Sequence, residues 1–591
     1  MVLSRHLTRR RIAYFSIVVA AVAGLALFLA LRRPPRVDMA RYVPSGTLAF
    51  IEVDNLTDLV SDLTDTKAWR ELAPALGVSS QLGQIGIAAD LMSRTGVGPD
   101  EAVLASRAQV AVALTGIEAQ TGMNEEGPYI HFKPQFALVA ETHSNPQSAA
   151  RIVGERASIL AARIYGDSIT ERAEVYYGAR LLAYHGADPD RQLVAASTGS
   201  LVLIGNHVSS VKACLDAIGG RTAVLAEDET LKGLRPTIDR SASVFAFVTQ
   251  AGIEKLVEFG PAIFASRFTT DPDRISSMAN LFGHLSRQTT AGLFYSAAFD
   301  SGLVVERYLT VLRPQVAEAL AGALKPAPAA FFDMLELAPR RVEDFSAISV
   351  EGGAGELPER VLRQMAPQLD LVAGVALREF VINFREQLGL EANESLGDAL
   401  GNDLLLVRFD QSQPVVMVAR ANDRARLSPT LARYLARGGA QVSAREHNGI
   451  EISVSSNEDG RAAAFVEGFL ILGTFDQIAA MIEARSGGQA LADDERLSRA
   501  LATRPPGASF VSYRPDADSA ADMMLAIARL TRVSDGSREQ LEQPEVRRAI
   551  ERMPPSVSFT EFRDYGIYTE TRSAVGSFSL ISSLVGGDEG P

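Results

Sequence analysis

The same motifs occur twice along this chain, in the same order. The acidic segment Leu225–Leu231 is echoed 266 residues later by Leu491–Leu497. An apolar segment precedes each one, at 200–220 and 469–488, and the two apolar segments are also similar. Because the order of similar segments is preserved, the sequence predicts two tandem copies of one folding unit.

The boundaries of the copies follow from where the matching segments begin and end. The first α+β repeat is predicted at 43–312 and the second at 338–578. The linker between them, 313–337, is rich in Ala and Pro, which is typical of a connecting helix followed by an extended segment. Residues 579–591 are predicted to be a flexible tail. A chain of 591 residues exceeds the size at which a single core keeps growing, so more than one domain is expected.

Local signals within each copy predict an α+β fold with largely antiparallel sheets. Three strands are predicted at 174–184, 192–198 and 200–206. Each copy ends in a glycine-centred hairpin, at Gly302 and at Gly566.

Helix starts are also visible in the sequence. Asn145-Pro146 combines a cap residue with proline at the first helical position, and Asn422-Asp423 stands at the matching place in the second copy. Thr474 and Gln477 form a capping box. The stretch 118–129 has no counterpart in the second copy and is predicted to be an exposed loop.

An apolar run of twenty residues, 12–31, contains no charge. As a helix it would span a bilayer core of about 30 Å, and no small-residue cleavage site follows it. The sequence therefore predicts an N-terminal transmembrane helix that acts as a single-pass signal anchor. Residues 1–11 are predicted to be a cytoplasmic basic tail and 32–42 a linker. The anchor is predicted to lie in the cell inner membrane, with the body outside the cytoplasm, in the periplasm or extracytoplasmic space.

Charge is divided unevenly along the chain. Residues 1–36 carry seven arginines and no acid, so the overall charge of −13 leaves −20 for the rest. An acidic body lacks the basic footprint of nucleic-acid binders, so no nucleic-acid partner is expected. The single cysteine, Cys214, lies in an apolar context and is predicted to be a buried small hydrophobe.

Motifs for common chemistries are missing from the sequence. The seven histidines are scattered without metal-ligand spacing, and there is no nucleophile elbow or Walker loop. His207 is predicted to be a surface residue at a helix start. The Gly352–Gly355 turn resembles a phosphate-cradling loop, but it lacks the rest of a dinucleotide fingerprint and is predicted to be a plain turn.

The acidic runs 227–229 and 493–495 occupy matching places in the two copies. They fit the first turn of a helix, where negative charge complements the dipole, and a calcium site is the alternative. The Asp-Pro-Asp segments 188–190 and 271–273 are predicted to be solvated loops.

Three segments are rich in adaptable apolar side chains: 259–268, 331–335 and 523–525. Core packing explains them, and a cavity for a lipid is the alternative. No catalytic, cofactor-binding or metal-binding residue is predicted, and no cofactor.

The opening of the body, Tyr42–Leu56, combines a Pro-x-x-Thr-Leu-x-Phe strand with a following Thr66-x-x-Trp69 helix. This start resembles the bacterial membrane-anchored family catalogued as domain of unknown function thirty-three fifty-two. The resemblance implies a membrane segment before the body and supplies no catalytic residues. No tryptophan stands at the matching place in the second copy, so Trp69 is predicted to be a packing anchor.

Together these features predict an uncharacterised, membrane-anchored cell-envelope protein that is a non-enzymatic scaffold or binding module, with an envelope protein or lipid as partner. The alternatives are a carrier or chaperone for a lipid or other hydrophobic cargo, and a hydrolase with a dispersed active site. An apolar cavity of several hundred Å³ would favour the carrier. Convergent carboxylates or a Ser–His pair at hydrogen-bond distance would favour the enzyme.

Overall fold

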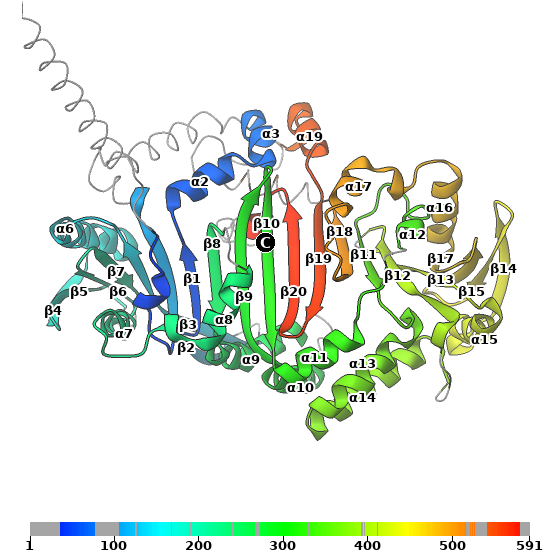
Figure 1. Ribbon diagram of the computed structural model, residues 1–591, viewed down its shortest axis with the longest axis horizontal. Helices are drawn as coiled ribbons and strands as arrows, with labels where there is room; N and C mark the ends of the chain where they lie inside the picture. Colours follow the sequence, from blue (N-terminus) through cyan, green and yellow to red (C-terminus); the bar gives the residue numbers. More distant parts are fainter. Residues whose placement is uncertain are drawn as a thin grey trace, which may run out of the picture. The chain divides into compact units, whose positions relative to one another are not determined.

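The computed structural model describes most of the body (Figure 1). The described residues are 36–76, 106–124, 127–166, 168–188, 191–238, 242–265, 272–328, 331–391, 394, 396–410, 412–515, 521, 523, 525 and 541–579. The predicted basic tail, the predicted anchor at 12–31 and all but the first residue of the predicted flexible tail lie outside them. Within the described residues, no helix has both the length and the apolarity needed to cross a bilayer.

The chain divides into two compact units. Unit 1 comprises Met1–Asp65, Ser79–Leu234 and Ser243–Ala246, and unit 2 comprises Thr66–Val78, Arg235–Ala242 and Phe247–Pro591. The hairpin that ends the first predicted repeat thus belongs to the same compact unit as the second repeat.

Unit 1 is built on an antiparallel sheet with the strand order β1–β2–β3–β7–β6–β5–β4. These strands are β1 (Ala49–Val53), β2 (Gln109–Asn124), β3 (Gly127–Glu141), β4 (Thr170–Tyr176), β5 (Ala179–His185), β6 (Gln192–Thr198) and β7 (Leu201–Gly205). β8 (Val244–Val248), at the boundary of the units, pairs with β1. The helices are η1 (Met39–Tyr42), α2 (Leu56–Thr64), α6 (Pro146–Tyr165), α7 (Val208–Ile218), η2 (Leu225–Glu227) and the start of α8 (Glu229–Ile238).

Unit 2 contains a longer antiparallel sheet, with the order β9–β10–β20–β19–β18–β11–β12–β13–β17–β16–β15–β14. The strands are β9 (Thr290–Asp300), β10 (Leu303–Leu312), β11 (Asp344–Ser349), β12 (Leu400–Arg408), β13 (Val416–Ala421), β14 (Val442–His447), β15 (Ile450–Ser455), β16 (Arg461–Val466), β17 (Phe469–Thr474), β18 (Ala508–Arg514), β19 (Ser556–Arg563) and β20 (Gly566–Ser573).

Helices surround this second sheet. They are α3 (Lys67–Ala75), α9 (Gln250–Ala265), α10 (Pro272–Thr289), α11 (Pro314–Ala323), α12 (Phe332–Leu335), α13 (Leu357–Met365), α14 (Leu371–Gln387), α15 (Arg424–Leu435), α16 (Phe475–Ser486), α17 (Glu495–Leu501) and α19 (Pro544–Glu551). Short 3-10 turns are η3 (Ala354–Glu356), η4 (Ala366–Gln368), η5 (Gly397–Ala399), η6 (Arg437–Gly439), η7 (Leu491–Asp493) and η9 (Gly576–Ser579). The predicted α+β class with largely antiparallel sheets is confirmed.

The strand order of unit 1 recurs in unit 2 with every strand number ten higher. The segments that precede β1 and β11 also make corresponding backbone hydrogen bonds. Ser45 N donates to Ala223 O at 2.9 Å, as Arg340 N donates to Gln489 O at 3.0 Å. Leu225 N donates to Val43 O at 2.8 Å, as Leu491 N donates to Ala338 O at 2.7 Å. Segments that the sequence aligned by similarity therefore have the same neighbours in the sheet.

Two strand predictions were wrong. The stretch 118–129 is not a loop: β2 and β3 continue through it as a hairpin, paired as far as Asn124 with Gly127. The segment 174–184 is two strands rather than one, because Tyr177 and Gly178 turn the chain between β4 and β5. Both turn residues have positive φ, +47° and +86°, which a two-residue hairpin of the matching twist requires.

The predicted helix starts are confirmed. The side chains of Asn145, Asp423 and Thr474 each accept a hydrogen bond from a backbone amide in the first turn of α6, α15 and α16. Gln477 completes the capping box with Thr474.

The hydrophobic core of unit 2 lies between one face of its sheet and the helices α12, α16 and α17. Fully buried members include Phe345 on β11, Ile471 on β17 and Met481 on α16. A separate cluster in unit 1 packs α6 against β5 and β6, around Tyr184. In unit 2, the opposite side of β12, β13, β16 and β17 packs against α15 in a further cluster, which includes Leu427 and Leu470.

Candidate binding surface

Helix α14 (Leu371–Gln387) exposes several large apolar side chains. The exposed fractions are 83% for Leu371, 62% for Val372, 51% for Val375 and 37% for Ile382, and the helical repeat places these four side chains on one side of α14. A soluble helix normally turns its apolar residues towards the core, and clustered apolar exposure marks interaction sites. This exposed side of α14 is called the α14 face below.

The inward side of α14 is packed. Ala373 and Val381 are 1% and 3% exposed. Phe384 and the following Leu388 and Leu390 line an apolar cavity of about 90 Å³, together with residues of α15, β12, β13 and β17. The helix is therefore seated in unit 2 by one side while the other side remains open.

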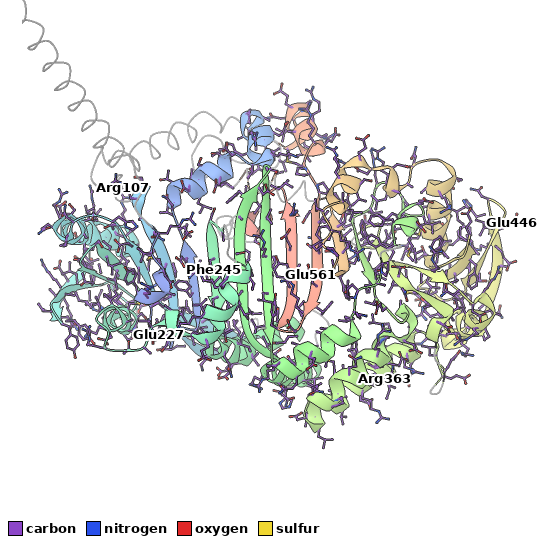
Figure 2. The ribbon with its side chains drawn as sticks, in the orientation of Figure 1. Arg107, Glu227, Phe245, Arg363, Glu446 and Glu561 are labelled. Carbon is purple, nitrogen blue, oxygen red and sulfur yellow. The ribbon has the colours of Figure 1, made fainter. Side chains whose placement is uncertain are left out.

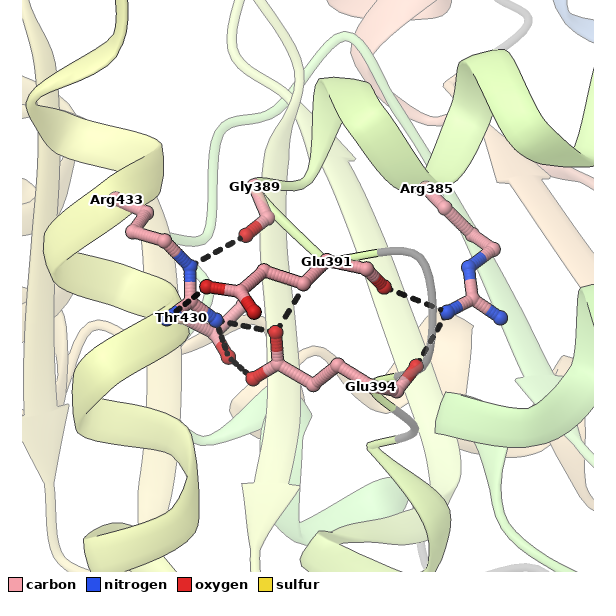
Figure 3. A network of polar contacts seen from close by, with 6 residues as sticks. All are labelled: Arg385, Gly389, Glu391, Glu394, Thr430 and Arg433. Carbon is pink, nitrogen blue, oxygen red and sulfur yellow. Dashed lines mark hydrogen bonds and ion pairs between the residues drawn. The ribbon is translucent and has the colours of Figure 1, made fainter.

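The C-terminal end of α14 is fixed by a network of polar contacts (Figure 3). Arg385 donates to Glu359 Oε1 at 2.7 Å and to the backbone oxygen of Glu391 at 3.0 Å. Arg433 on α15 donates to the backbone oxygen of Gly389 at 3.0 Å and to the carboxylate of Glu394. These charge-assisted hydrogen bonds hold the described residues Gly389, Glu391 and Glu394, which follow α14, in place.

Glu394 is the centre of this network. Burial acts to raise the pKa of its carboxyl, but hydrogen bonds from Thr430, the Glu391 amide and Arg433 outweigh it, so the pKa lies below its ordinary value. The carboxylate form is thus the one that these contacts stabilise.

The N-terminal end of α14 is held by Asp370. Its Oδ1 accepts a hydrogen bond from the Ala373 amide at 2.9 Å, which caps the helix, and its Oδ2 lies 2.7 Å from His284 Nε2 on α10. The Ala373 amide, followed by His284 and Gln288, lowers the pKa of Asp370. With both ends fixed, α14 presents its apolar face without having to be ordered on binding, which reduces the entropic cost of association.

Residues that the sequence singled out lie elsewhere and have structural roles. His207 caps α7: its Nδ1 accepts from the Ser209 amide at 3.3 Å and lies 2.6 Å from Ser209 Oγ. This is a Ser–His pair at hydrogen-bond distance, but the two residues belong to one helix turn, and among the described residues His207 contacts no carboxylate to orient it. The predicted helix-start position is confirmed.

Cys214 is completely buried in α7, and burial raises the pKa of its thiol to about 12. The prediction of a buried small hydrophobe is confirmed. Trp69 is 5% exposed in α3, whose cap Thr66 accepts a hydrogen bond from the Trp69 amide at 3.2 Å. This burial fits the predicted packing role.

The paired acidic runs start helices, as predicted. Asp228 accepts from the Leu231 amide at 2.8 Å, and Asp494 accepts from the Arg496 amide at 2.8 Å. Glu227 (Figure 2) belongs to the 3-10 turn ahead of α8. Among the described residues, no group of three or more His, Cys, Asp or Glu side chains is placed to hold a metal ion.

The Gly352–Gly355 turn leads from β11 to α13, and its polar groups are engaged within the protein. Arg360 donates to the carbonyl oxygens of Gly352 at 2.9 Å and Gly353 at 3.3 Å, and the Gly353 amide donates to Asn402 Oδ1 at 2.9 Å. A phosphate would have to compete with these bonds, so the turn has the character of a structural one.

The two Asp-Pro-Asp segments, 188–190 and 271–273, differ in the local structure of their described residues. Asp188 accepts a backbone bond from Arg191 in a turn before β6, whereas Pro272 begins α10, so the second segment contains a helix start rather than a loop. Asp190 and Asp271 lie outside the described residues.

The apolar residues described in these segments pack as core, except Phe332, which is 42% exposed. Phe331, Met334 and Leu335 are almost completely buried, and so are Met523 and Leu525. Side chains of 259–268 lie outside the description. The apolar cavity beside α14, at about 90 Å³, is well below the roughly 300–1,000 Å³ of ordinary small-molecule sites.

The α14 face was not identified from the sequence, although a signal was present. Residues 371–377 are apolar without interruption, and such a run leaves no polar side to face water. A helix that is apolar all round must be either surrounded by protein or used as a contact surface. Comparisons with protein-family models, with curated proteins and with solved structures found no match.

Proposed function

We propose that this chain is a non-enzymatic, membrane-anchored scaffold or binding module of the bacterial cell envelope, and that it holds a protein partner through the α14 face. The observation that carries the proposal is the exposure of four large apolar side chains on one helix that is fixed at both ends. Isolated exposed apolar residues are ordinary, but a group of them on a rigid helix favours an interaction surface.

A protein partner is favoured over a lipid surface by charge. Helices that lie in a membrane interface carry lysine or arginine on their polar side. The exposed charged residues of α14 are Arg378, Glu379 and Glu386, and the body as a whole carries −20. Anionic lipids would be repelled by such a surface, whereas a protein groove with an apolar floor would accept it.

The anchor is the apolar run 12–31, which places residues 1–11 in the cytoplasm and the body in the periplasm. Support comes from its length, its freedom from charge and the missing cleavage site. Protease added to spheroplasts should digest the body, whereas protection of the body would reverse this topology.

The two repeats arose by tandem duplication of one α+β unit. The recurring strand order and the corresponding backbone hydrogen bonds of the segments before β1 and β11 support this, as does the order of similar segments in the sequence. The family resemblance of residues 42–72 to domain of unknown function thirty-three fifty-two belongs to the same proposal.

The test is photo-crosslinking in living cells with a photoreactive residue at Ile382 of the full-length protein, which lies on the same side of α14 as Leu371 and Val375. A discrete protein adduct is expected, and it should disappear when Leu371 and Val375 are both changed to Asn. Val175 on β4, which is 76% exposed, serves as the matched control position and should give no such adduct.

An adduct that forms equally at Val175, or that survives the double substitution, would refute the role of the α14 face. Native mass spectrometry of the protein purified from membranes provides a second arm. A co-purifying lipid there would favour the carrier alternative instead.

A further inference from the structure

A row of polar side chains crosses five neighbouring strands of unit 2. The register of the sheet places Ser346 on β11 opposite Ser512 on β18, then Ser558 on β19, Thr571 on β20 and finally Glu306 on β10. Neighbouring strands lie about 4.8 Å apart, so the row is about 19 Å long. It is called the hydroxyl row below.

The hydroxyl row forms the floor of a hollow of about 590 Å³. Further along the same face, Phe510 and Phe562 pack in an apolar cluster with Leu324 at the end of α11, and that part of the face is covered. The hydroxyl row lies beyond this cover. Glu561 (Figure 2) alternates with Ser558 and Thr560 along β19 and belongs to the opposite face.

One end of the row is a fixed carboxylate. Glu306 is only 2% exposed, and among the described residues it has no lysine, arginine or histidine partner. Its Oε1 accepts hydrogen bonds from the Tyr295 hydroxyl at 2.7 Å and the Ser577 amide at 2.9 Å. Tyr308, whose hydroxyl lies 2.7 Å from Ser577 Oγ, also lines the hollow and is 36% exposed.

The charges around the hollow are balanced. Its lining includes two carboxylates, Glu306 and Asp344, and two guanidinium groups, Arg408 and Arg514. Asp344 pairs with Arg408 at 3.8 Å. Within the described part of the chain, the hydroxyls of Ser346 and Ser512 have no hydrogen-bond partner, whereas Ser558 and Thr571 bond to each other at 2.7 Å. The floor therefore offers groups that both donate and accept, without a net charge that would select an ion.

The polar groups of the hollow restrict the class of ligand that it can bind. An apolar ligand would remove the floor hydroxyls from water without replacing their hydrogen bonds, which is costly. An extended peptide is recognised at the open edge of a sheet, by backbone groups that this face does not present. A chain of sugar rings supplies hydroxyls along its length, and the exposed Tyr308 ring offers an apolar surface beside them.

We propose that the hydroxyl row is a binding site for a neutral oligosaccharide, which lies across the strands with one end at Glu306. About four rings match the length of the row, given the strand spacing of about 4.8 Å. The site is separate from the α14 face and does not depend on the scaffold role.

The test is calorimetric titration of the full-length protein in detergent with two neutral probes, chitotetraose and maltotetraose. We expect saturable binding of at least one of them. Binding should change less than two-fold between low and high salt, because no net charge contributes, and a steep salt dependence would overturn the neutral-ligand assignment.

A matched control is built into the same two strands. Thr560 and Thr569 form a second hydroxyl pair, at 2.9 Å, one row along from Ser558 and Thr571 and outside the hollow lining. Thr571→Val should weaken binding at least three-fold, and the double variant Ser558→Ala with Thr571→Val about ten-fold, from the usual cost of a lost hydrogen bond. Thr569→Val should leave binding unchanged.

Two outcomes would overturn the proposal. One is the absence of binding of both probes up to millimolar concentration by a protein whose thermal unfolding is intact. The other is equal weakening by Thr569→Val and Thr571→Val, because that would place the ligand elsewhere or show a general effect on the sheet.

Discussion

Replacing Gly566 by Ala is expected to break the pairing of β10 with β20. Gly566 begins β20 with φ of +149°, and an added Cβ would lie 2.0 Å from the backbone oxygen of Thr310 and 3.1 Å from the Leu312 amide. Neither neighbour is a side chain that could move aside. Gly449, in the β14–β15 turn, is the matched control: its φ is +78°, but nothing lies within 4 Å of an added Cβ.

The magnitudes follow from these geometries. At Gly449 only the left-handed backbone is penalised, which costs about 1 kcal/mol. At Gly566 a backbone region reserved for glycine costs up to about 3 kcal/mol. The clash also removes hydrogen bonds at the end of the pairing, including Leu312 N to Tyr565 O at 3.1 Å, each worth about 1 kcal/mol. The expected loss at Gly566 is therefore at least about 3 kcal/mol.

Thermal unfolding of the full-length protein in detergent, followed by circular dichroism, measures the difference. Gly449→Ala should lower the Tm by about 2–4 °C and Gly566→Ala by about 6–12 °C. Hydrogen exchange should show faster exchange of amides in β20 for Gly566→Ala alone. Equal Tm shifts for the two variants, or unchanged protection of β20, would refute the reasoning.

Three further outcomes are expected. Cys214 should resist a thiol reagent at pH 8 until the chain is denatured, because it is fully buried and burial raises its pKa to about 12. The reaction is followed by the absorbance of the thiolate that the reagent releases, and reaction of the folded protein at the rate of a free thiol would contradict this prediction. Asp494→Asn should lower the Tm at neutral pH, where the cap is worth about 1 kcal/mol, and Glu495→Gln should not. Burial acts to raise the pKa of Asp494 but its hydrogen bonds with Arg496 outweigh this and lower it, so the difference from wild type should be complete above the ordinary carboxyl pKa and should be lost as the pH falls through the lowered pKa of the folded protein. Trp69, the single tryptophan, should emit at short wavelength and resist acrylamide quenching, and emission at the wavelength of an exposed indole would disprove its burial.

Much of the local structure could be predicted because it depends on local chemistry. A cap residue such as Asn145 or Asp423 satisfies amides in its own helix turn, so the signal lies within a few positions. The strand order could not be predicted in the same way. In the polar stretch 118–129, the end of β2 pairs with the start of β3 through backbone hydrogen bonds. A hydrophobic pattern does not indicate such pairing.

The two surfaces were hidden for a related reason. An apolar run such as 371–377 predicts burial, and only the packed neighbours of α14 reveal which side remains exposed. The hydroxyl row requires the register of five strands whose residues lie up to 267 positions apart, from Glu306 to Ser573 in the same hollow. Single serines and threonines in exposed strand positions carry no sequence signal that they share a row.

The pairing of β10 with β20 has a consequence for biosynthesis. These strands are antiparallel neighbours, from Val304 with Ser573 to Val311 with Gly566, yet more than 250 residues of chain separate them. When β9 and β10 have formed their hairpin, the other edge of β10 stays unpaired until nearly the whole polypeptide has emerged. An open edge is a template for wrong strand addition, and distant contacts form slowly. Newly made chains should therefore need protection of this edge until the last strands arrive, and truncation before β20 should yield aggregates rather than a smaller folded protein.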